Sequence, residues 1–132
     1  VDQNYFKGFD IVPNIKGDGR IVYLLSNYLK NNSSGSTNKI LINAEIKKDK
    51  NIKEKNIKNE ITKYQVHINV LVKYKKINDL NSYEFSKTQS GEFNVTTQHS
   101  QTLNNEKKLI ELLTESLADD ILEELHVKIN DL

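Results

Sequence analysis

The sequence contains no cysteine, methionine or tryptophan, and it has a single proline. Without cysteine, the chain has no disulfide bond, no thiolate zinc site and no cysteine nucleophile. Long hydrophobic runs are absent too, because pieces such as residues 21–25 are far shorter than the roughly 20 apolar residues of a membrane-spanning helix. Since the chain begins at Val1 rather than at Met, we expect a processed targeting segment or an artificial boundary upstream.

The charge of the chain is nearly balanced. Its 132 residues include 19 Lys+Arg and 18 Asp+Glu, for a formal net charge of +1. This length fits one domain covering residues 1–132. The small basic excess argues against a nucleic-acid-binding protein, which neutralises many phosphates. Among the basic residues only Arg20 is an arginine, and AT-rich codon usage explains such a preference for lysine.

Hydrophobic periodicity predicts six structural elements. The clearest is a strand over residues 62–75, where apolar residues at even positions alternate with mostly polar residues at odd positions. Apolar residues at helical spacing predict two amphipathic helices. In order, the predicted elements are a strand over 5–13, a helix over 20–30, strands over 39–47, 62–75 and 82–97, and a helix over 105–127.

Turn and cap residues define the expected ends of these elements. Pro13 is expected to close the first strand, and Asp18 to cap the first helix. A lysine-rich connection is expected over residues 49–59. Gly91 is interpreted as the site of a β-bulge and Asn104 as the cap of the last helix.

The predicted fold is of the α+β class, with the order β-α-β-β-β-α and two helices packed on one face of a four-stranded sheet. Apolar stripes on both helices are expected to cover the even-numbered face of strand 62–75, with Ile68 at its centre. The stripe residues are Leu24 and Leu25 in the first helix and Ile110, Leu113, Leu117 and Ile121 in the second, with Leu109 and Leu112 widening the latter.

The sequence shows no catalytic, cofactor-binding or metal-binding pattern. Its three histidines have no ligand partner at metal spacing, and we expect all of them at the surface: His67, His99 and His126. Neighbouring carboxylates in the last helix point about 100° apart, so they cannot face each other across a cleft. The residues by themselves therefore indicate no catalytic site, no cofactor and no metal.

Three local patterns follow one another in a distinctive order and spacing. The first is Arg20 followed by Leu24 and Leu29 in the first helix. The second is Tyr64-Gln65-Val66 at the start of a long strand that ends near Tyr74. The third comprises Phe85-Ser86-Lys87, Phe93-Asn94, Asn104-Asn105-Glu106 and Leu117-Ala118-Asp119-Asp120-Ile121. Over nearly the whole chain, this arrangement resembles the LptE family of outer-membrane lipoproteins that assemble lipopolysaccharide.

The resemblance implies a non-enzymatic role in lipopolysaccharide transport. Members of the family share the two-helix, four-strand fold and are anchored by a lipidated Cys, which here would lie upstream of this chain. They sit as a plug inside a large β-barrel partner, LptD, and help deliver lipopolysaccharide to the cell surface. The implied location is the periplasmic side of the outer membrane.

The resemblance also implies a lipopolysaccharide-binding site formed by basic residues. One family contact lies between the second and third strands, where this chain offers Lys50, Lys53, Lys55 and Lys58. A second lies just before the last helix, where this chain departs from the pattern with Leu103. The main alternative hypothesis is an auxiliary periplasmic lipoprotein of another lipid-transport system, and a further alternative is an enzyme or a nucleic-acid-binding module.

Overall fold

A computed structural model describes residues 10–31 and 39–130 of the chain. The elements are β1 (Asp10–Lys16), α1 (Gly19–Asn31), β2 (Lys39–Lys55), β3 (Ile61–Lys76), β4 (Tyr83–Asn94) and α2 (His99–Asn130). This order confirms the predicted β-α-β-β-β-α arrangement and the α+β class.

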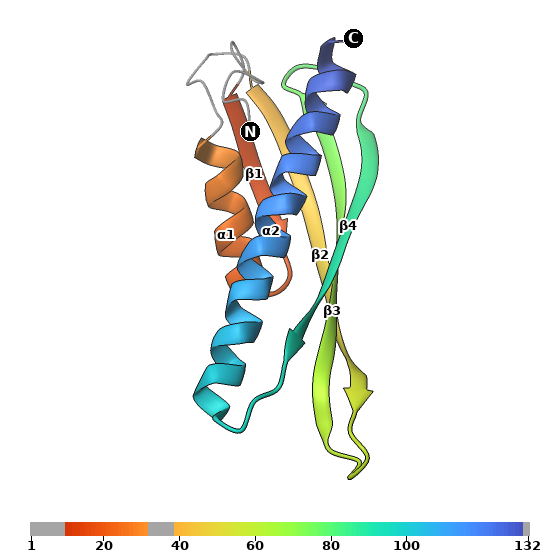
Figure 1. The fold of residues 1–132 in the computed structure, drawn as a ribbon. Helices are drawn as coiled ribbons and strands as arrows, with labels where there is room; N and C mark the ends of the chain where they lie inside the picture. The colour runs from red at the N-terminus through yellow and green to blue at the C-terminus, as the bar shows by residue number, and fades with distance from the viewer. Residues whose placement is uncertain (1–9, 32–38, 131–132) are drawn as a thin grey trace.

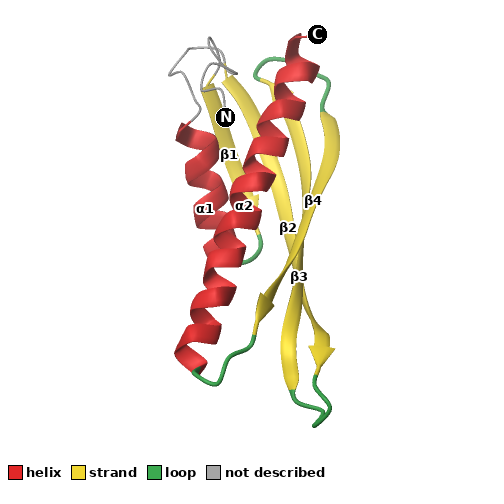
Figure 2. Cartoon of the chain, viewed as in Figure 1, coloured by secondary structure: helices red, strands yellow, loops and turns green. Residues whose placement is uncertain are grey.

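The four strands form one mixed sheet in the order β1-β2-β3-β4. β1 runs parallel to β2, whereas β3 is antiparallel to both β2 and β4. Both helices lie on the same face of this sheet, and α2 runs along most of its length (Figure 1). Figure 2 shows that the opposite face carries no helix among the described residues.

The core lies between the sheet and the two helices. Ile68 is fully buried, together with Val66, Val70 and Val72, so the predicted register of β3 is confirmed. α1 contributes the buried side chains of Ile21, Leu25 and Leu29, while Leu24 is only half-buried. α2 contributes Ile110, Leu113, Leu117, Ala118, Ile121, Leu122 and Leu125. Leu109 packs against this core as predicted, but Leu112 points outward and is 62% exposed.

The first strand differs from its predicted range. β1 continues to Lys16, so Pro13 lies inside the strand and does not end it. An edge strand tolerates proline because one side of its backbone has no ladder partner. Residues 5–9, which were predicted as part of this strand, lie outside the described residues.

The turn from β1 into α1 is tightly built. The Asp18 side chain caps α1 as predicted, since its Oδ1 accepts hydrogen bonds from the backbone amides of Arg20 and Ile21, both at 3.2 Å. Gly17 has a φ of 137°, a conformation that other residues rarely adopt. A Cβ at Gly17 would also lie 2.7 Å from the backbone oxygen of Ile46.

The second strand is much longer than predicted. β2 extends to Lys55 and stays paired with β3 until Lys55 meets Ile61, with a register irregularity between Ile52 and Lys55. The predicted lysine-rich connection over residues 49–59 is therefore mostly strand. Pairing with the long β3 satisfies the backbone groups of a segment whose own composition favours a loop.

The end of β4 and the start of α2 correct two further predictions. Gly91 pairs with Val66 without a register shift, so it is not a bulge. A Cβ at Gly91 would lie 2.7 Å from Leu109 Cδ1, so glycine allows α2 to approach β4 closely. α2 begins at His99, and Asn104 lies inside it rather than at its cap.

Thr96 and Thr102 bracket the start of α2. Thr102 Oγ1 accepts a hydrogen bond from the Thr96 backbone amide at 2.8 Å. Thr96 Oγ1 donates to the Gln98 carbonyl oxygen, also at 2.8 Å. α2 therefore begins six residues before its predicted start at residue 105. His99 is the first residue of this helix, and Leu103 lies within it.

Candidate lipopolysaccharide-binding hairpin

The candidate lysines lie on the β2–β3 hairpin, whose end projects beyond the start of α2 (Figure 1). Lys50 and Lys53 are in β2, Lys55 is the last residue of β2, and Lys58 is in the turn. We call residues 53–60 the hairpin tip. The structure spreads the four lysines along the hairpin, and their partners differ.

The ammonium group of Lys50 already has partners within the protein. Its Nζ lies 3.0 Å from Glu106 Oε1 on α2. The same nitrogen lies 4.6 Å from the ring centroid of Tyr64 and 5.4 Å from that of Phe93. These two rings stack with their centroids 5.5 Å apart. Lys50 therefore links β2 to α2 over an aromatic pair, and a ligand would have to compete with Glu106 for its charge.

Lys53 faces the helix-free side of the sheet. Its Nζ lies 3.8 Å from Glu92 Oε1. Glu92 is next to the buried Phe93 in β4, and successive strand residues point to opposite faces. Both side chains of this pair are more than two-fifths exposed, so water screens the attraction and a stronger anionic ligand can displace Glu92.

Lys55 and Lys58 are exposed and have no ion-pair partner in the described part of the chain. Asn56 fixes the tip between them, because its Oδ1 accepts hydrogen bonds from the backbone amides of Lys58 at 2.9 Å and Glu60 at 3.0 Å. Asn59 has a φ of 65°, which lets the chain reverse. Lys55 and Lys58 are thus the two candidate lysines that the structure leaves open to an anionic ligand.

The helix-free face of the sheet contains a feature that the sequence did not single out. A depression of about 340 Å³ is lined by polar and charged side chains around Leu71. Asn14 Nδ2 donates to Asn43 Oδ1 at 3.1 Å across its floor. The alternating polar residues of β3 predicted a solvent-exposed face of this strand. The strands that complete the depression beside it could be identified only from the strand order of the sheet. The charged lining residues are Lys16, Glu45 and Lys73.

Within residues 10–31 and 39–130, no cluster of histidine and carboxylate side chains could hold a metal ion. Burial is the main reason why the pKa values of Tyr28, Tyr74 and Asp119 lie above their ordinary values. Nearby carboxylates also raise the pKa values of Tyr28 and Asp119. For Tyr74, Glu124 and Tyr83 add to the effect of burial. These three groups lie beside the core and away from the candidate lysines, so the shifts reflect packing.

No protein-family model and no curated protein matches this sequence. Solved structures nevertheless share its fold almost from end to end. Rare lipoprotein B from Shewanella oneidensis has a TM-score of 0.69 at 8% identity, covering 93% of this chain and 96% of that chain. A candidate lipoprotein from Caulobacter crescentus has a TM-score of 0.66 at 13% identity, covering 98% and 95%.

A third structure extends the same likeness. Lipoprotein B from Nitrosomonas europaea has a TM-score of 0.57 at 9% identity, covering 95% of this chain and 86% of that chain. At such low identities the agreement establishes a shared fold. The chain therefore has the fold of these bacterial lipoproteins. Because nearly all of each compared chain is covered, the likeness involves the whole arrangement of sheet and helices.

Proposed function

We propose that the protein is an LptE-type accessory component of lipopolysaccharide transport and assembly at the outer membrane. The observation that carries this proposal is the nearly end-to-end fold agreement with rare lipoprotein B. The ordered sequence patterns that resemble the LptE family also support it. In this role the chain acts without catalysis, as plug and lipopolysaccharide-binding partner of an LptD β-barrel.

The attachment to the membrane is proposed to be a lipidated Cys upstream of the chain. None of the helices in the described residues combines the length and the apolar character needed to span a bilayer. A lipid anchor places such a domain at the membrane without a spanning segment. The domain would then face the periplasm.

The helix-free sheet face suits a position inside a barrel. Its exposed side chains are mostly polar or charged, such as Asn43, Glu45 and Lys73. Leu71 and Val12 are apolar exceptions. The interior of a large outer-membrane barrel is polar as well. Such a face can therefore contact the barrel wall through hydrogen bonds and water without an extended apolar surface.

The proposed lipopolysaccharide contact lies at the hairpin tip. Lys55 and Lys58 offer open ammonium groups to phosphates or acidic sugars, and Lys53 can join them by leaving Glu92. Lys50 is proposed to contribute least, because Glu106 already binds its ammonium group. The proposed site therefore consists mainly of three of the four lysines that the sequence indicated.

Copurification tests the proposal most directly. The full-length protein, with its native upstream segment and a C-terminal tag, is expressed in its own host and purified from detergent-solubilised membranes. An LptD-type barrel should be recovered with it, and an untagged strain serves as the control. Recovery of the subunits of a different lipid transporter would favour the auxiliary-lipoprotein alternative, and a cytosolic location would contradict both.

A further inference from the structure

β4 forms the edge of the sheet on the side away from β1 (Figure 1). The strand order ends at β4, and among the described residues no strand pairs with its outer side. α2 packs on the helix-covered face of β4, where Gln89 Nε2 donates to Asp120 Oδ2 at 2.8 Å. Every second residue of β4 therefore points its backbone donor and acceptor outward, in the plane of the sheet.

The two edges of the sheet differ in how well they could accept another strand. β1 has 7 residues, and Pro13 lies inside it. Proline lacks a backbone N–H, so it blunts an edge against further pairing. β4 has 12 residues and no proline. β4 is therefore the edge that offers a long, uninterrupted row of backbone hydrogen-bonding groups.

A second copy of the same strand can pair with this edge only in certain registers. In an antiparallel pair, directly opposite residues point to the same face of the sheet. Two copies related by a two-fold axis therefore carry their helices on the same face of a continuous sheet, and the axis passes at a single residue of β4. Only the registers centred on Thr88 or Gln89 use nearly the whole strand.

Charge distinguishes these two registers. Centring on Thr88 places Glu84 of one copy opposite Glu92 of the other, and this unfavourable contact occurs twice. Centring on Gln89 places Asn94 opposite Glu84. Glu92 then lies opposite a serine, so no two like charges meet directly. The register centred on Gln89 is therefore the self-complementary one.

The same register also matches the side chains on the helix-covered face. It places Phe85 of one copy opposite Phe93 of the other, an aromatic cross-strand pair that occurs twice. Lys87 is the only charged side chain of β4 on this face, and it lies opposite Gly91, which has no side chain to obstruct it. The Lys87 ammonium group already lies 3.9 Å from Glu124 of α2, so pairing leaves no unmatched charge near the centre.

A groove of about 280 Å³ between β4 and α2 adjoins the aromatic pair. Its apolar lining is formed by Phe93, Leu109 and Leu112, and Leu112 is 62% exposed. Phe85 of a second copy, lying opposite Phe93, would extend this apolar lining on the open side of the groove. Strand pairing would therefore shield apolar surface that the single chain leaves in contact with water.

We propose that β4 is a self-association edge, through which two copies of this chain form an antiparallel, two-fold symmetric dimer with one continuous sheet. Gln89 lies at the axis. The occupant is a second copy because the strand complements itself in charge, in aromatic pairs and at Gly91. Such a dimer keeps a long edge from pairing with unrelated chains. It needs neither the barrel nor lipopolysaccharide, so it goes beyond the function proposed above.

Charges introduced on the helix-free face test the register. Thr88 and Ser90 are exposed there, and Thr88 of one copy lies opposite Ser90 of the other in the proposed dimer. Thr88→Lys with Ser90→Lys places like charges opposite each other twice, whereas Thr88→Glu with Ser90→Lys places opposite charges there. Sedimentation velocity over a wide concentration range should show a monomer–dimer equilibrium for the wild-type chain. The first variant should weaken dimerisation about tenfold, and the second should not weaken it.

Introduced cysteines report the register directly, because the chain has none of its own. Thr88→Cys and Ser90→Cys are made as separate chains with different tags and are mixed under mild oxidation. Opposite residues of an antiparallel pair have Cα atoms about 4.5–5.5 Å apart, which is within disulfide range. We expect a disulfide between the two variants and little dimer from either one alone. A disulfide of Thr88→Cys with itself would indicate the other register and overturn the proposed one.

Circular dichroism checks that every variant is folded. A wild-type chain that stays monomeric at all concentrations, or a dimer equally stable in both charge variants, would overturn the proposal. If the chain is monomeric and Thr88→Lys with Ser90→Lys abolishes barrel copurification, the edge binds a strand of the barrel instead of a second copy. Barrel copurification of the wild-type protein does not require the dimer, so a failure here is distinguishable from a failure of the proposed function.

Discussion

Lys50 and Glu106 form an ion pair between the middle of the long hairpin and the first turns of α2, with Nζ and Oε1 3.0 Å apart. The pair lies over the stacked rings of Tyr64 and Phe93. It joins the part of β2 that the sequence indicated as a loop to a helix that begins earlier than the sequence indicated. Both elements extend toward the same end of the molecule, and this contact connects them there.

The ion pair predicts a structural role for Lys50. Lys50→Gln should lower the free energy of unfolding by about 1 kcal/mol, because a partly exposed ion pair and a cation–π contact are lost. It should leave lipopolysaccharide affinity close to that of the wild type. Urea denaturation and a lipopolysaccharide-binding titration check the two parts. A loss of affinity as large as that of Lys55→Gln would show that Lys50 leaves Glu106 to bind the ligand.

Charge reversal at the other candidate lysines should affect binding instead. Changing Lys53, Lys55 and Lys58 to Glu should weaken lipopolysaccharide binding, since attraction for phosphates becomes repulsion, while the thermal midpoint stays nearly the same. The matched control is charge reversal of Lys75 and Lys76 at the far end of the sheet. Binding of the triple variant is best measured at low salt, where charge contacts are strongest. Unchanged affinity under that condition would remove the hairpin tip as the site.

The core position of Ile68 predicts a large stability effect. Ile68→Ala should lower the free energy of unfolding by about 2–5 kcal/mol, because the side chain is fully buried and its removal leaves a cavity. Leu71→Ala, on the helix-free face of the same strand, is the control and should cost much less. Equilibrium urea unfolding of both variants gives the comparison. Similar losses for the two would mean that the helix-free face is also buried in solution.

Gly17 and Gly19 provide a second matched pair. Gly17→Ala should destabilise the fold by about 1–3 kcal/mol, since the new Cβ meets the Ile46 carbonyl oxygen and φ is 137°. Gly19→Ala should be neutral or slightly stabilising, because a Cβ there has no atom within 4 Å and α1 begins at this residue. Thermal unfolding monitored by circular dichroism distinguishes the two. Equal midpoints would contradict the tight turn before α1.

Asp119 predicts a dependence of stability on pH. Burial, with contributions from Glu115 and Asp120, raises the pKa of this carboxyl group in the folded state. A raised pKa means that the ionised form is disfavoured by folding, so this stability contribution is present at low pH and is lost as the pH rises through the folded-state pKa. Asp119→Asn should therefore be more stable than the wild type at pH 7.

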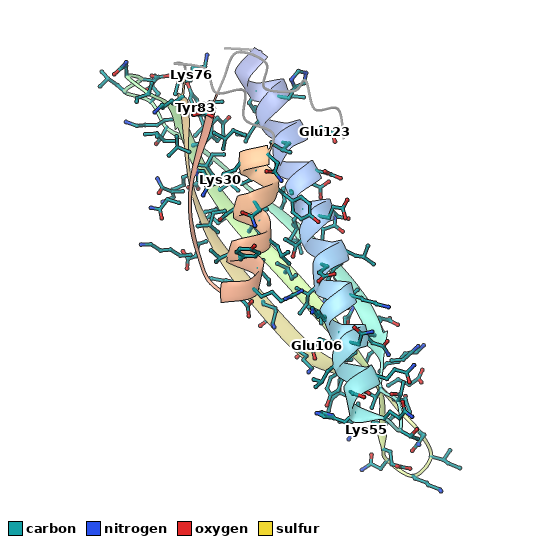
Figure 3. All side chains as sticks on the ribbon, turned by 90° about the vertical axis from the view of Figure 1, so that its left-hand side faces the viewer. Lys30, Lys55, Lys76, Tyr83, Glu106 and Glu123 are labelled. Carbon is teal, nitrogen blue, oxygen red and sulfur yellow. The ribbon has the colours of Figure 1, made fainter. Side chains whose placement is uncertain are left out.

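The advantage of Asp119→Asn should disappear below the ordinary carboxyl pKa of 3.8, where Asp119 is protonated in both states. Urea unfolding at pH 7 and at acidic pH measures the difference. The control is Glu123→Gln on the exposed side of the same helix (Figure 3). A constant difference between Asp119→Asn and the wild type at all pH values would assign the effect to packing rather than ionisation.

The sequence alone determined the order of the elements, the register of β3 and the cap of α1. Each of these follows from local information, because alternation over β3 assigns its residues to faces, and Asp18 has free amides within reach of its own carboxylate. The strict period of two leaves no choice of which β3 face is buried. The whole-chain resemblance depended on the same periodic patterns.

The tertiary structure alone decided how far β2 extends and what each lysine contacts. Local composition favours a loop around residues 49–55, but β3 offers a continuous row of backbone donors and acceptors that overrides this preference. The partners of Lys50 and Lys53, Glu106 and Glu92, lie far away in the sequence, so no spacing rule could have paired them. Only the packing of α2 and β4 against the hairpin left Lys55 and Lys58 as the open pair.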